Sequence, residues 1–379
     1  MTHSNVYKDE LTCRERLERT FEGREVDRIA TYDIIHNVEL IEYATGQKVT
    51  PVNAEDLLCR TINRYLDLVR HFAVPDYEGV KIIDEGDGFV YRYEWWTGQI
   101  LQKPAFKTVE DVVRLVEKDI EKISACTEKG KICQAANNHV NLFYEKFEYF
   151  EEVCREYRRI SEKLGGTVML GPEMPMGVSI ALFRYGIDWW TYLYHDCPEI
   201  ALKYIQVYSD YETAFINSYA GMYDMPFVCS AGSTGLNDRL LFAYDFFKEV
   251  ILPAEKKVID AFKRNGKKYI IHFLDGYKWP IINDFVDMGT DAVDPFEPYC
   301  LMDIKKFRQQ FPETVVCQPV DCTQLLPYGT EEQVKEATLN AIKDAGGYKI
   351  LIGSTSEIHP EVNYRNAVAM YESARSFTL

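Results

Sequence analysis

The sequence predicts an α/β fold in which parallel strands alternate with helices and close into a single eight-stranded (β/α)8 TIM barrel. Eight short β-branched or apolar runs each end in polar or glycine residues. Amphipathic helical patterns separate most of these runs, and from Lys267 onward each strand-plus-helix unit has the roughly 20–45 residues that one barrel repeat requires. The eight runs end near Asp33, Asp84, Gly171, Ser230, His272, Phe296, Gln318 and Gly353. The helical patterns include Phe246–Arg264, Met302–Gln310, Glu331–Ala345 and Asn363–Arg375.

The domain organisation follows from how these units are joined. A chain of 379 residues allows two or three domains of roughly 100–200 residues each, but no linker, low-complexity tract or internal repeat divides it. We therefore expect one domain over residues 1–379, with N-terminal helices over about residues 1–26. The stretch Gly88–Gln102 alternates apolar and polar residues around Thr97-Gly98, which predicts a β-hairpin. With the helical residues 108–164 it forms an insertion over about residues 88–164.

The composition excludes several classes of partner. The chain carries 43 Lys and Arg against 59 Asp and Glu, a formal charge of -16, which repels phosphate backbones and anionic lipids. No apolar stretch approaches the ~20 residues that span a bilayer, and Met1–Leu11 has no signal-peptide core. The ten cysteines are scattered without a CxxC pair and are interpreted as reduced thiols. We expect a cytoplasmic protein that binds neither nucleic acid nor membrane; its oligomeric state stays open, a homodimer included.

Polar residues at the strand ends are the first candidates for chemistry, because active sites of such barrels lie at the carboxyl ends of the strands. Asp33 and His36 follow the first run, and Asp33 fits a general acid or base and a helix N-cap equally well. Asp84 follows the second run, where solvated loop acids are the favoured interpretation. Glu173 is a lone carboxylate among Pro and Met, a setting that would raise its pKa and suit proton transfer.

A metal site is a second interpretation of the strand ends. His272 ends the fifth run, Glu297 the sixth, and Cys317 lies in the seventh. Imidazole, carboxylate and thiolate together suit zinc, and an open fourth position would make such a site catalytic. The alternative is a hydrogen-bonded histidine, a rim glutamate and a buried cysteine, and no short fixed spacing decides between the two.

Other polar and aromatic residues at the expected mouth are candidates for substrate binding. Ser230 opens SAGSTG, which lacks a following Lys or Arg and therefore predicts a hydroxyl-lined turn for a neutral ligand rather than a phosphate loop. Trp95 and Trp96 in the predicted hairpin either pack or sandwich a planar or methylated substrate. The remaining candidates are His36, Asp321 and Ser354.

Taken in order, several segments resemble the uroporphyrinogen decarboxylase superfamily, in the branch that contains the corrinoid-dependent methyltransferases. TCRERLERTFEGREVDRIATYD (Thr12–Asp33) is similar to its N-terminal helix, turn and first strand, and Phe246–Gly276 to the helix that leads to its His-containing fifth strand. DMGTDAVDPFEP, QPVDCTQLLPYGTEEQV and GGYKILIGSTSEIHPEVNYRNAVAM look like its closing landmarks. The resemblance implies the barrel fold and, in that branch, a corrinoid carried by a partner protein.

Two departures from the family pattern bear on the reaction. The haem-pathway decarboxylases carry arginines after the first strand, where this chain has Ile34–Val38, so a polycarboxylate such as uroporphyrinogen is disfavoured. The coenzyme M methyltransferases hold zinc with a His-x-Cys and a later Cys. His272 matches that histidine, but the cysteine positions correspond to Leu274 and Ser354. Zinc, if bound, needs other ligands, for which Glu297 and Cys317 are the nearest candidates.

Three functional hypotheses follow. The leading one is a methyltransferase that moves a methyl group between a small ether, amine or thioether and the corrinoid of a partner protein, with His272, Glu173 and Asp33 as proton donors. The second is a metal-free decarboxylase of a smaller carboxylated ring, in which Asp33 or Asp84 stabilises a protonated intermediate. The third is a catalytically silent module that binds a corrinoid protein.

Overall fold

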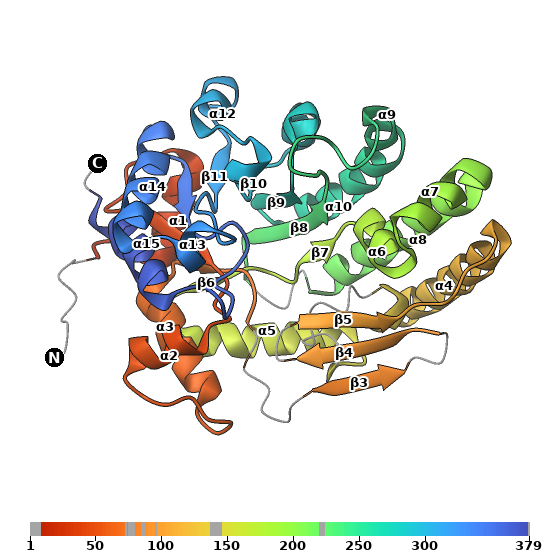
Figure 1. Cartoon of the computed structure of the whole chain (residues 1–379), viewed down its shortest axis with the longest axis horizontal. Helices are drawn as coiled ribbons and strands as arrows, with labels where there is room; N and C mark the ends of the chain where they lie inside the picture. Colours follow the sequence, from red (N-terminus) through yellow and green to blue (C-terminus); the bar gives the residue numbers. More distant parts are fainter. Residues whose placement is uncertain are drawn as a thin grey trace.

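A curled parallel sheet of nine strands forms the centre of the protein (Figure 1). The computed structural model describes residues 9–72, 74, 80–84, 88–94, 97–136, 146–219 and 224–377. The strand order is β6-β2-β1-β12-β11-β10-β9-β8-β7, which confirms the predicted α/β class. The strands are β1 (Ala30–Asp33), β2 (Leu68–Val69), β6 (Val168–Met169), β7 (Met174–Pro175), β8 (Phe227–Ser233), β9 (Tyr269–Asp275), β10 (Ala292–Asp294), β11 (Val315–Cys317) and β12 (Ile350–Ile352).

The two end strands of this sheet are consecutive in the chain. Four residues separate β6, which pairs with β2, from β7, which pairs with β8. Between them the Gly171 N–H donates to the Phe227 carbonyl of β8 at 3.2 Å. The sheet therefore curls until its first and last strands are joined by one short segment.

Helices surround the sheet, and local sequence signals explain where several of them begin and end. Thr12, Thr108 and Thr330 form capping boxes with the residue three positions later, and left-handed Gly23 and Gly130 end two of these helices. The helices up to residue 219 are α1 (Cys13–Glu22), α2 (Val38–Thr45), α3 (Ala54–Tyr65), α4 (Val109–Lys129), α5 (Phe150–Leu164), α6 (Gly177–Tyr185), α7 (Ile187–Asp196) and α8 (Pro198–Tyr219). The later ones are α9 (Tyr244–Phe246), α10 (Leu252–Arg264), α11 (Ile282–Met288), α12 (Ile304–Gln310), α13 (Leu325–Tyr328), α14 (Glu331–Asp344) and α15 (Tyr364–Ser376).

The core has two layers, because alternate residues of each strand point to opposite faces of the sheet. One cluster fills the interior of the curled sheet and includes Tyr32, Cys229, Ile271, Phe273 and Cys317. The α1 residues Leu17 and Phe21 belong to the same cluster, and the Phe21 ring lies 4.9 Å from that of Tyr269, the first residue of β9. Helix α1 therefore closes the amino-terminal end of the interior. The second, larger cluster lies between the sheet and the outer helices.

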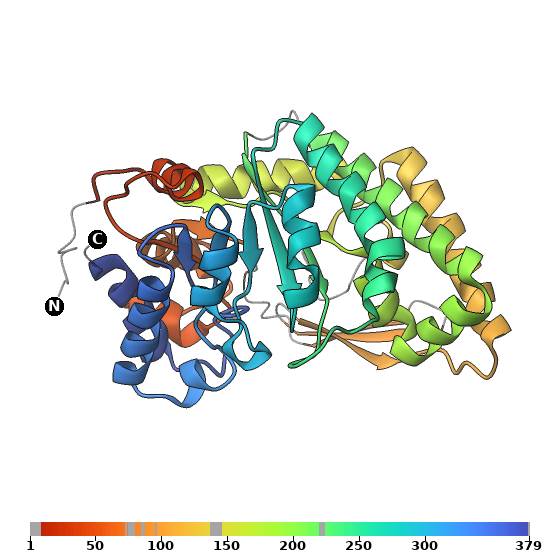
Figure 2. The same ribbon diagram turned by 90° about the horizontal axis from the view of Figure 1, so that it is seen from above.

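The second strand of the sheet differs from the sequence prediction. The run ending at Asp84 is not part of the parallel sheet: β3 (Lys81–Asp84) pairs antiparallel with β4 (Val90–Glu94), which pairs antiparallel with β5 (Thr97–Gln102). The predicted hairpin is therefore present, within a separate three-stranded sheet that lies beside α4 (Figures 1 and 2). The second parallel strand is β2, whose two residues are too few to show a periodic pattern.

The second half of the chain matches its predictions closely. The predicted helices 302–310, 331–345 and 363–375 correspond to α12, α14 and α15, and 246–264 corresponds to α9, a π-helical turn and α10. The C-terminal helices lie next to the N-terminal segment in both views (Figures 1 and 2). None of the helices in the described ranges combines the length and apolarity needed to cross a membrane.

Candidate active site

An ion pair between Arg70 and Glu173 lies at the mouth, by which we mean the carboxyl ends of the parallel strands. The Arg70 Nε donates to Glu173 Oε2 at 2.5 Å, and His71 Nε2 lies 3.1 Å from the same oxygen. The guanidinium stacks on the Phe273 ring, 3.5 Å from its centroid. Burial alone would raise the pKa of Glu173, but Arg70 and His71 reverse the direction and hold it well below its ordinary value. Glu173 is therefore a fixed anion, contrary to the raised pKa expected from its apolar neighbours in sequence.

Two aspartates face the same interior, and their pKa values are raised, whereas that of Glu173 is lowered. Asp294 ends β10 and pairs in register with the inward-facing Phe273, and Asp275 ends β9 two residues beyond Phe273. Burial raises the pKa of Asp275 to about 7, assisted by the nearby Glu297 charge and opposed by Arg70. Burial likewise raises the pKa of Asp294 to about 8, again opposed by Arg70. Both carboxyl groups can therefore hold and release a proton near neutral pH.

Buried polar atoms around Asp294 lack partners. Both of its carboxyl oxygens and the nearby Tyr32 hydroxyl are buried with no hydrogen-bond partner among the described residues. The Tyr32 hydroxyl lies beside Asp294 but outside regular hydrogen-bond geometry. Unpaired buried polar atoms cost free energy, and such groups at the mouth of a barrel are the arrangement expected where a polar ligand is bound.

The structure places Asp33 in a different environment from these two aspartates. Its carboxylate accepts bonds from the Ser354 N–H at 2.8 Å, the Ser354 hydroxyl at 2.7 Å, the Ile34 N–H at 2.9 Å and the Tyr371 hydroxyl of α15 at 2.9 Å. Burial raises its pKa to about 7 even though these donors oppose the shift. Asp33 and Ser354 thus join β1, β12 and α15, and Asp33 is not the N-cap of α2, a role that Asn37 fills.

His272 points away from the interior, toward the helices. Its Nδ1 lies 2.6 Å from the Thr290 hydroxyl, and its ring packs edge-on against Phe285 of α11. The Nε2 lies 3.6 Å from Glu255 Oε2 of α10, an oxygen that also accepts the Ser230 hydroxyl at 2.7 Å. Both predicted site residues, His272 and Ser230, therefore contact the helix layer, while the mouth is lined by their neighbours in the strands.

The predicted metal ligands are not brought together. Cys317 lies in the interior cluster, on the opposite face of the sheet from His272, and burial raises the pKa of its thiol. Glu297 accepts the Gly276 N–H at 2.8 Å and lies 3.6 Å from the buried Lys278 ammonium. Within the described ranges no three His, Cys, Asp or Glu side chains form a group that could hold a metal ion. The set His272, Glu297 and Cys317 does not fit zinc.

The remaining candidates are dispersed. His36 is buried near His71, and burial followed by the His71 charge lowers its pKa well below the ordinary value, so its imidazole is neutral. Asp84 is exposed at the end of β3. Asp321 accepts the Thr323 hydroxyl at 2.7 Å and the N–H groups at the start of α13, so it stabilises a turn. Trp95 and Trp96 lie outside the described residues.

The sequence pattern only partly indicated which residues converge at the mouth. Asp275 and Asp294 stand at strand ends, but both faces of a barrel strand are buried, so the pattern does not show which residues point inward. Arg70 follows a two-residue strand, and nothing in its local sequence distinguishes it from a surface arginine. An available signal was the alternation in YIIHFLD, which puts His272 and Asp275 on opposite faces.

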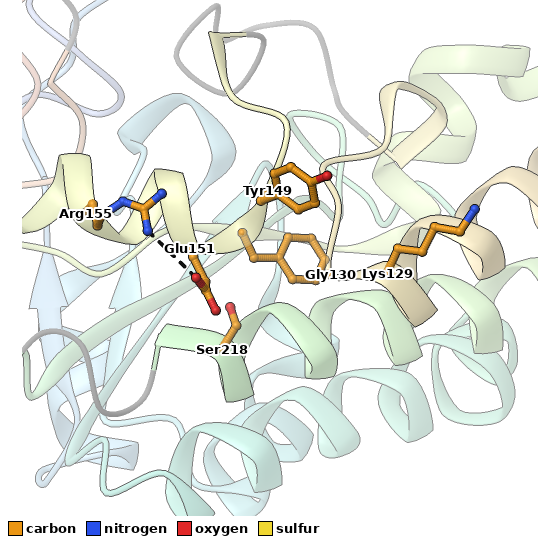
Figure 3. Close-up of a pocket in the computed structure, with 7 residues that line it drawn as sticks. Lys129, Gly130, Tyr149, Glu151, Arg155 and Ser218 are labelled. Atoms are coloured by element: carbon orange, nitrogen blue, oxygen red, sulfur yellow. Dashed lines mark ion pairs between the residues drawn. The ribbon is translucent and has the colours of Figure 1, made fainter.

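A separate hollow of about 260 Å³ lies where α4 ends and α5 begins (Figure 3). It is lined by Lys129, Gly130, Tyr149, Phe150, Glu151, Arg155 and Ser218. Arg155 is paired with Glu151 at 3.7 Å, and the Lys129 side chain points away from that pair. None of these lining residues is one of the strand-end residues described above, so the mouth remains the candidate active site.

Comparison with solved structures identifies proteins with a similar fold. Over 96% of this chain and 98% of the other, it superposes on a methyltransferase from Methanosarcina mazei with a TM-score of 0.66 and 15% sequence identity. A B12-independent methionine synthase from Shewanella sp. W3-18-1, in complex with selenomethionine, matches over 91% of this chain and 97% of its own, with 10% identity and a TM-score of 0.46. At these identities the likeness concerns the fold, and the second match is too distant to support any argument.

Sequence comparison gives the family. A search of curated proteins found no significant match. The family model described as uroporphyrinogen decarboxylase (URO-D) matches residues 134–377, more than half of the chain, and this range contains Glu173, Asp275 and Asp294. Together with the curled parallel sheet and the site at the carboxyl ends of its strands, this match establishes that the chain belongs to the uroporphyrinogen decarboxylase family.

Proposed function

We propose that the protein is a methyltransferase that moves a methyl group between a small methylated ether, amine or thioether and a corrinoid held by a partner protein. The observation that carries this proposal is the pair of inward-facing carboxyl groups, Asp275 and Asp294, whose pKa values of about 7 and about 8 lie near neutrality. They stand beside the Arg70–Glu173 ion pair at the mouth. The likeness in fold to the Methanosarcina methyltransferase is consistent with this chemistry.

The chemistry requires a proton at the substrate heteroatom. A corrinoid supplies a cobalt centre that accepts or donates the methyl group, and the chain must make the demethylated oxygen, nitrogen or sulfur a better leaving group. Asp294 in its neutral form has a proton to donate and no hydrogen-bond partner among the described residues that would hold it back. Asp275 is suited to relay a proton from solvent to Asp294 after each turnover, since it is less completely buried than Asp294.

The charges at the mouth favour a small substrate without several carboxylates. Arg70 is already paired with Glu173, and the Lys278 ammonium donates to the Pro295 carbonyl at 2.8 Å and lies near Glu297. A polycarboxylate that entered this interior would meet Asp275 and Asp294, and neither Arg70 nor Lys278 would be free to neutralise its charge. A neutral or weakly charged methylated compound does not meet this repulsion.

The proposal extends to the architecture. We treat β6 and β7 as the two halves of one interrupted strand, so that the sheet closes as an eight-stranded barrel in a single domain, with residues 88–164 as its insertion. The hydrogen bond from Gly171 to Phe227 between the two halves supports this interpretation. A closed barrel gives the mouth one opening, to which the corrinoid of the partner would be presented; we propose a cytoplasmic location for this encounter.

The direct test is the spectrum of cobalt. The purified protein is mixed with cob(I)alamin and a panel of methylated ethers, amines and thioethers, and methylcobalamin formation is followed by absorbance. Asp294→Asn should reduce the rate by about 10²–10⁴-fold, the usual contribution of a general acid, and Asp275→Asn should also reduce it. Asp260→Asn, on the half-exposed face of α10, is the matched control and should leave the rate unchanged.

Two outcomes would overturn the proposal. One is that no substrate yields methylcobalamin and no acceptor demethylates methylcobalamin. The other is release of carbon dioxide from a small carboxylated ring, which would identify a decarboxylase. A protein that binds a corrinoid carrier but shows no turnover of any kind would be the silent binding module.

A further inference from the structure

Two cysteines far from the mouth lie next to each other where α4 ends. Cys126 is in the last turn of α4, and the chain then turns back, so that the N–H of Lys131 donates to the Cys126 carbonyl at 2.9 Å. This turn brings Cys133 to Cys126, and the two thiols lie within hydrogen-bonding reach of each other. Both are unbridged.

The two thiols have different surroundings. Cys133 is 3% exposed within the main hydrophobic cluster, and its N–H donates to the Tyr211 hydroxyl of α8 at 3.1 Å. Cys126 is half-buried at the edge of the same cluster and is therefore accessible to a small reagent. One cysteine is thus positioned to meet a reagent from solvent, and the other is held behind it.

The charges at this turn favour a thiolate on the accessible cysteine. The neighbouring Cys133 thiol is the largest cause that lowers the Cys126 pKa to about 7; burial opposes it, and the Lys131 and Lys129 ammonium groups add to it. The Cys133 pKa moves the other way, because its proton is held by Cys126 and its thiol is buried. Lys131 itself is paired with Glu148 and lies over the Tyr149 ring. A thiolate beside a thiol is the arrangement of cysteines that react with oxidants.

We propose that Cys126 and Cys133 form an oxidant-sensitive modification site, in which Cys126 reacts with a small hydroperoxide and Cys133 resolves the product to a disulfide. The Cys126 thiolate attacks one peroxide oxygen of hydrogen peroxide; an S–O bond forms, the O–O bond breaks, and hydroxide leaves and is protonated to water. Cys133 then attacks the sulfenyl sulfur; the S–S bond forms, the S–O bond breaks, and a second water carries away the Cys133 proton. Two thiols are oxidised and one peroxide is reduced to two waters.

Mass spectrometry of the peroxide-treated full chain tests this site. The intact protein should lose two hydrogen atoms, and peptide mapping should find Cys126 linked to Cys133. Cys126→Ser should abolish the disulfide. Cys133→Ser should leave a sulfenic acid on Cys126 that dimedone traps, and Cys133→Ala serves where the serine variant folds poorly. Cys197→Ser, which removes another half-buried cysteine, is the control and should behave like the wild type.

A second measurement needs no variant. The rate at which iodoacetamide alkylates Cys126 should rise with pH and reach half its maximum near pH 7, whereas Cys13 and Cys197 should need more alkaline pH, since burial raises the pKa of both. In Cys133→Ala, which removes the neighbouring thiol, the Cys126 midpoint should move upward. Oxidation that maps to other cysteines, or alkylation of Cys126 no faster at neutral pH than that of Cys13 and Cys197, would overturn the proposal.

Discussion

At the scale of single residues, Asp33 and Asp294 show how two aspartates with similarly raised pKa values differ in their hydrogen bonding. Burial dominates both shifts, but Asp33 accepts four short hydrogen bonds and Asp294 accepts none from the described residues. Asp33 thus stabilises the fold, whereas the unpaired Asp294 is suited to bind a ligand.

Asp294→Asn should stabilise the protein, more so at alkaline pH. The unfolded chain releases this proton near pH 3.8 and the folded chain near pH 8, so the wild-type free energy of unfolding falls as the pH rises between these values. Asparagine has no proton to release, so the variant escapes this loss. We expect its free energy of unfolding to exceed that of the wild type by about 1–3 kcal/mol at pH 8.5, with a smaller difference at pH 5. Urea unfolding at both pH values measures it.

Asp33→Asn is the contrasting variant. An asparagine NH₂ would face the donors of Ser354 and Tyr371, so we expect a loss of at least about 2 kcal/mol at both pH values. A stabilising Asp33→Asn, or an Asp294→Asn that destabilises the protein at pH 8.5, would contradict this assignment of roles.

At the scale of elements, strand β9 determines which residues reach the site. His272 and Asp275 are three residues apart and therefore lie on opposite faces, one against α10 and α11 and the other in the interior. His272→Gln should lower the free energy of unfolding by about 1–3 kcal/mol through lost buried contacts, but leave the pH profile of methylcobalamin formation unchanged. Asp275→Asn should remove the limb of that profile near pH 7. Loss of turnover in a stably folded His272→Gln protein would place His272 in the reaction.

The same scale explains what could be predicted from the sequence. The strands from β8 to β12 and helices α12, α14 and α15 follow from apolar runs and amphipathic periods long enough to recognise. Strand β2 has only two residues, and the sequence prediction instead chose the run that ends at Asp84, which pairs with a hairpin. The site was harder still, because Arg70 depends on that short strand and both faces of β9 are buried.

At the scale of the whole molecule, a buried network of charges joins the two ends of the chain beneath the barrel. Arg16 of α1 donates to Asp67 at 2.7 Å and to Asp27 at 2.6 Å, and Arg28 also pairs with Asp67. Asp9 in the N-terminal segment lies 3.3 Å from Arg375 of α15. The N-terminal helix is thereby fixed across the amino-terminal end of the interior, to which Leu17 and Phe21 of the same helix contribute.

Arg16→Met should destabilise the whole fold by about 3–5 kcal/mol, because it leaves the fully buried Asp67 with one cation instead of two. Arg14→Met, two residues earlier on the same helix, is the matched control; its exposed pairs with Glu18 and Asp224 contribute about 0–1 kcal/mol. Urea unfolding of both variants, followed by circular dichroism, gives the comparison. If α1 were a dispensable extension, the two substitutions would have equally small effects. A large effect of Arg16→Met alone would show that the N-terminal helix is an integral part of the barrel and that the chain folds as one unit.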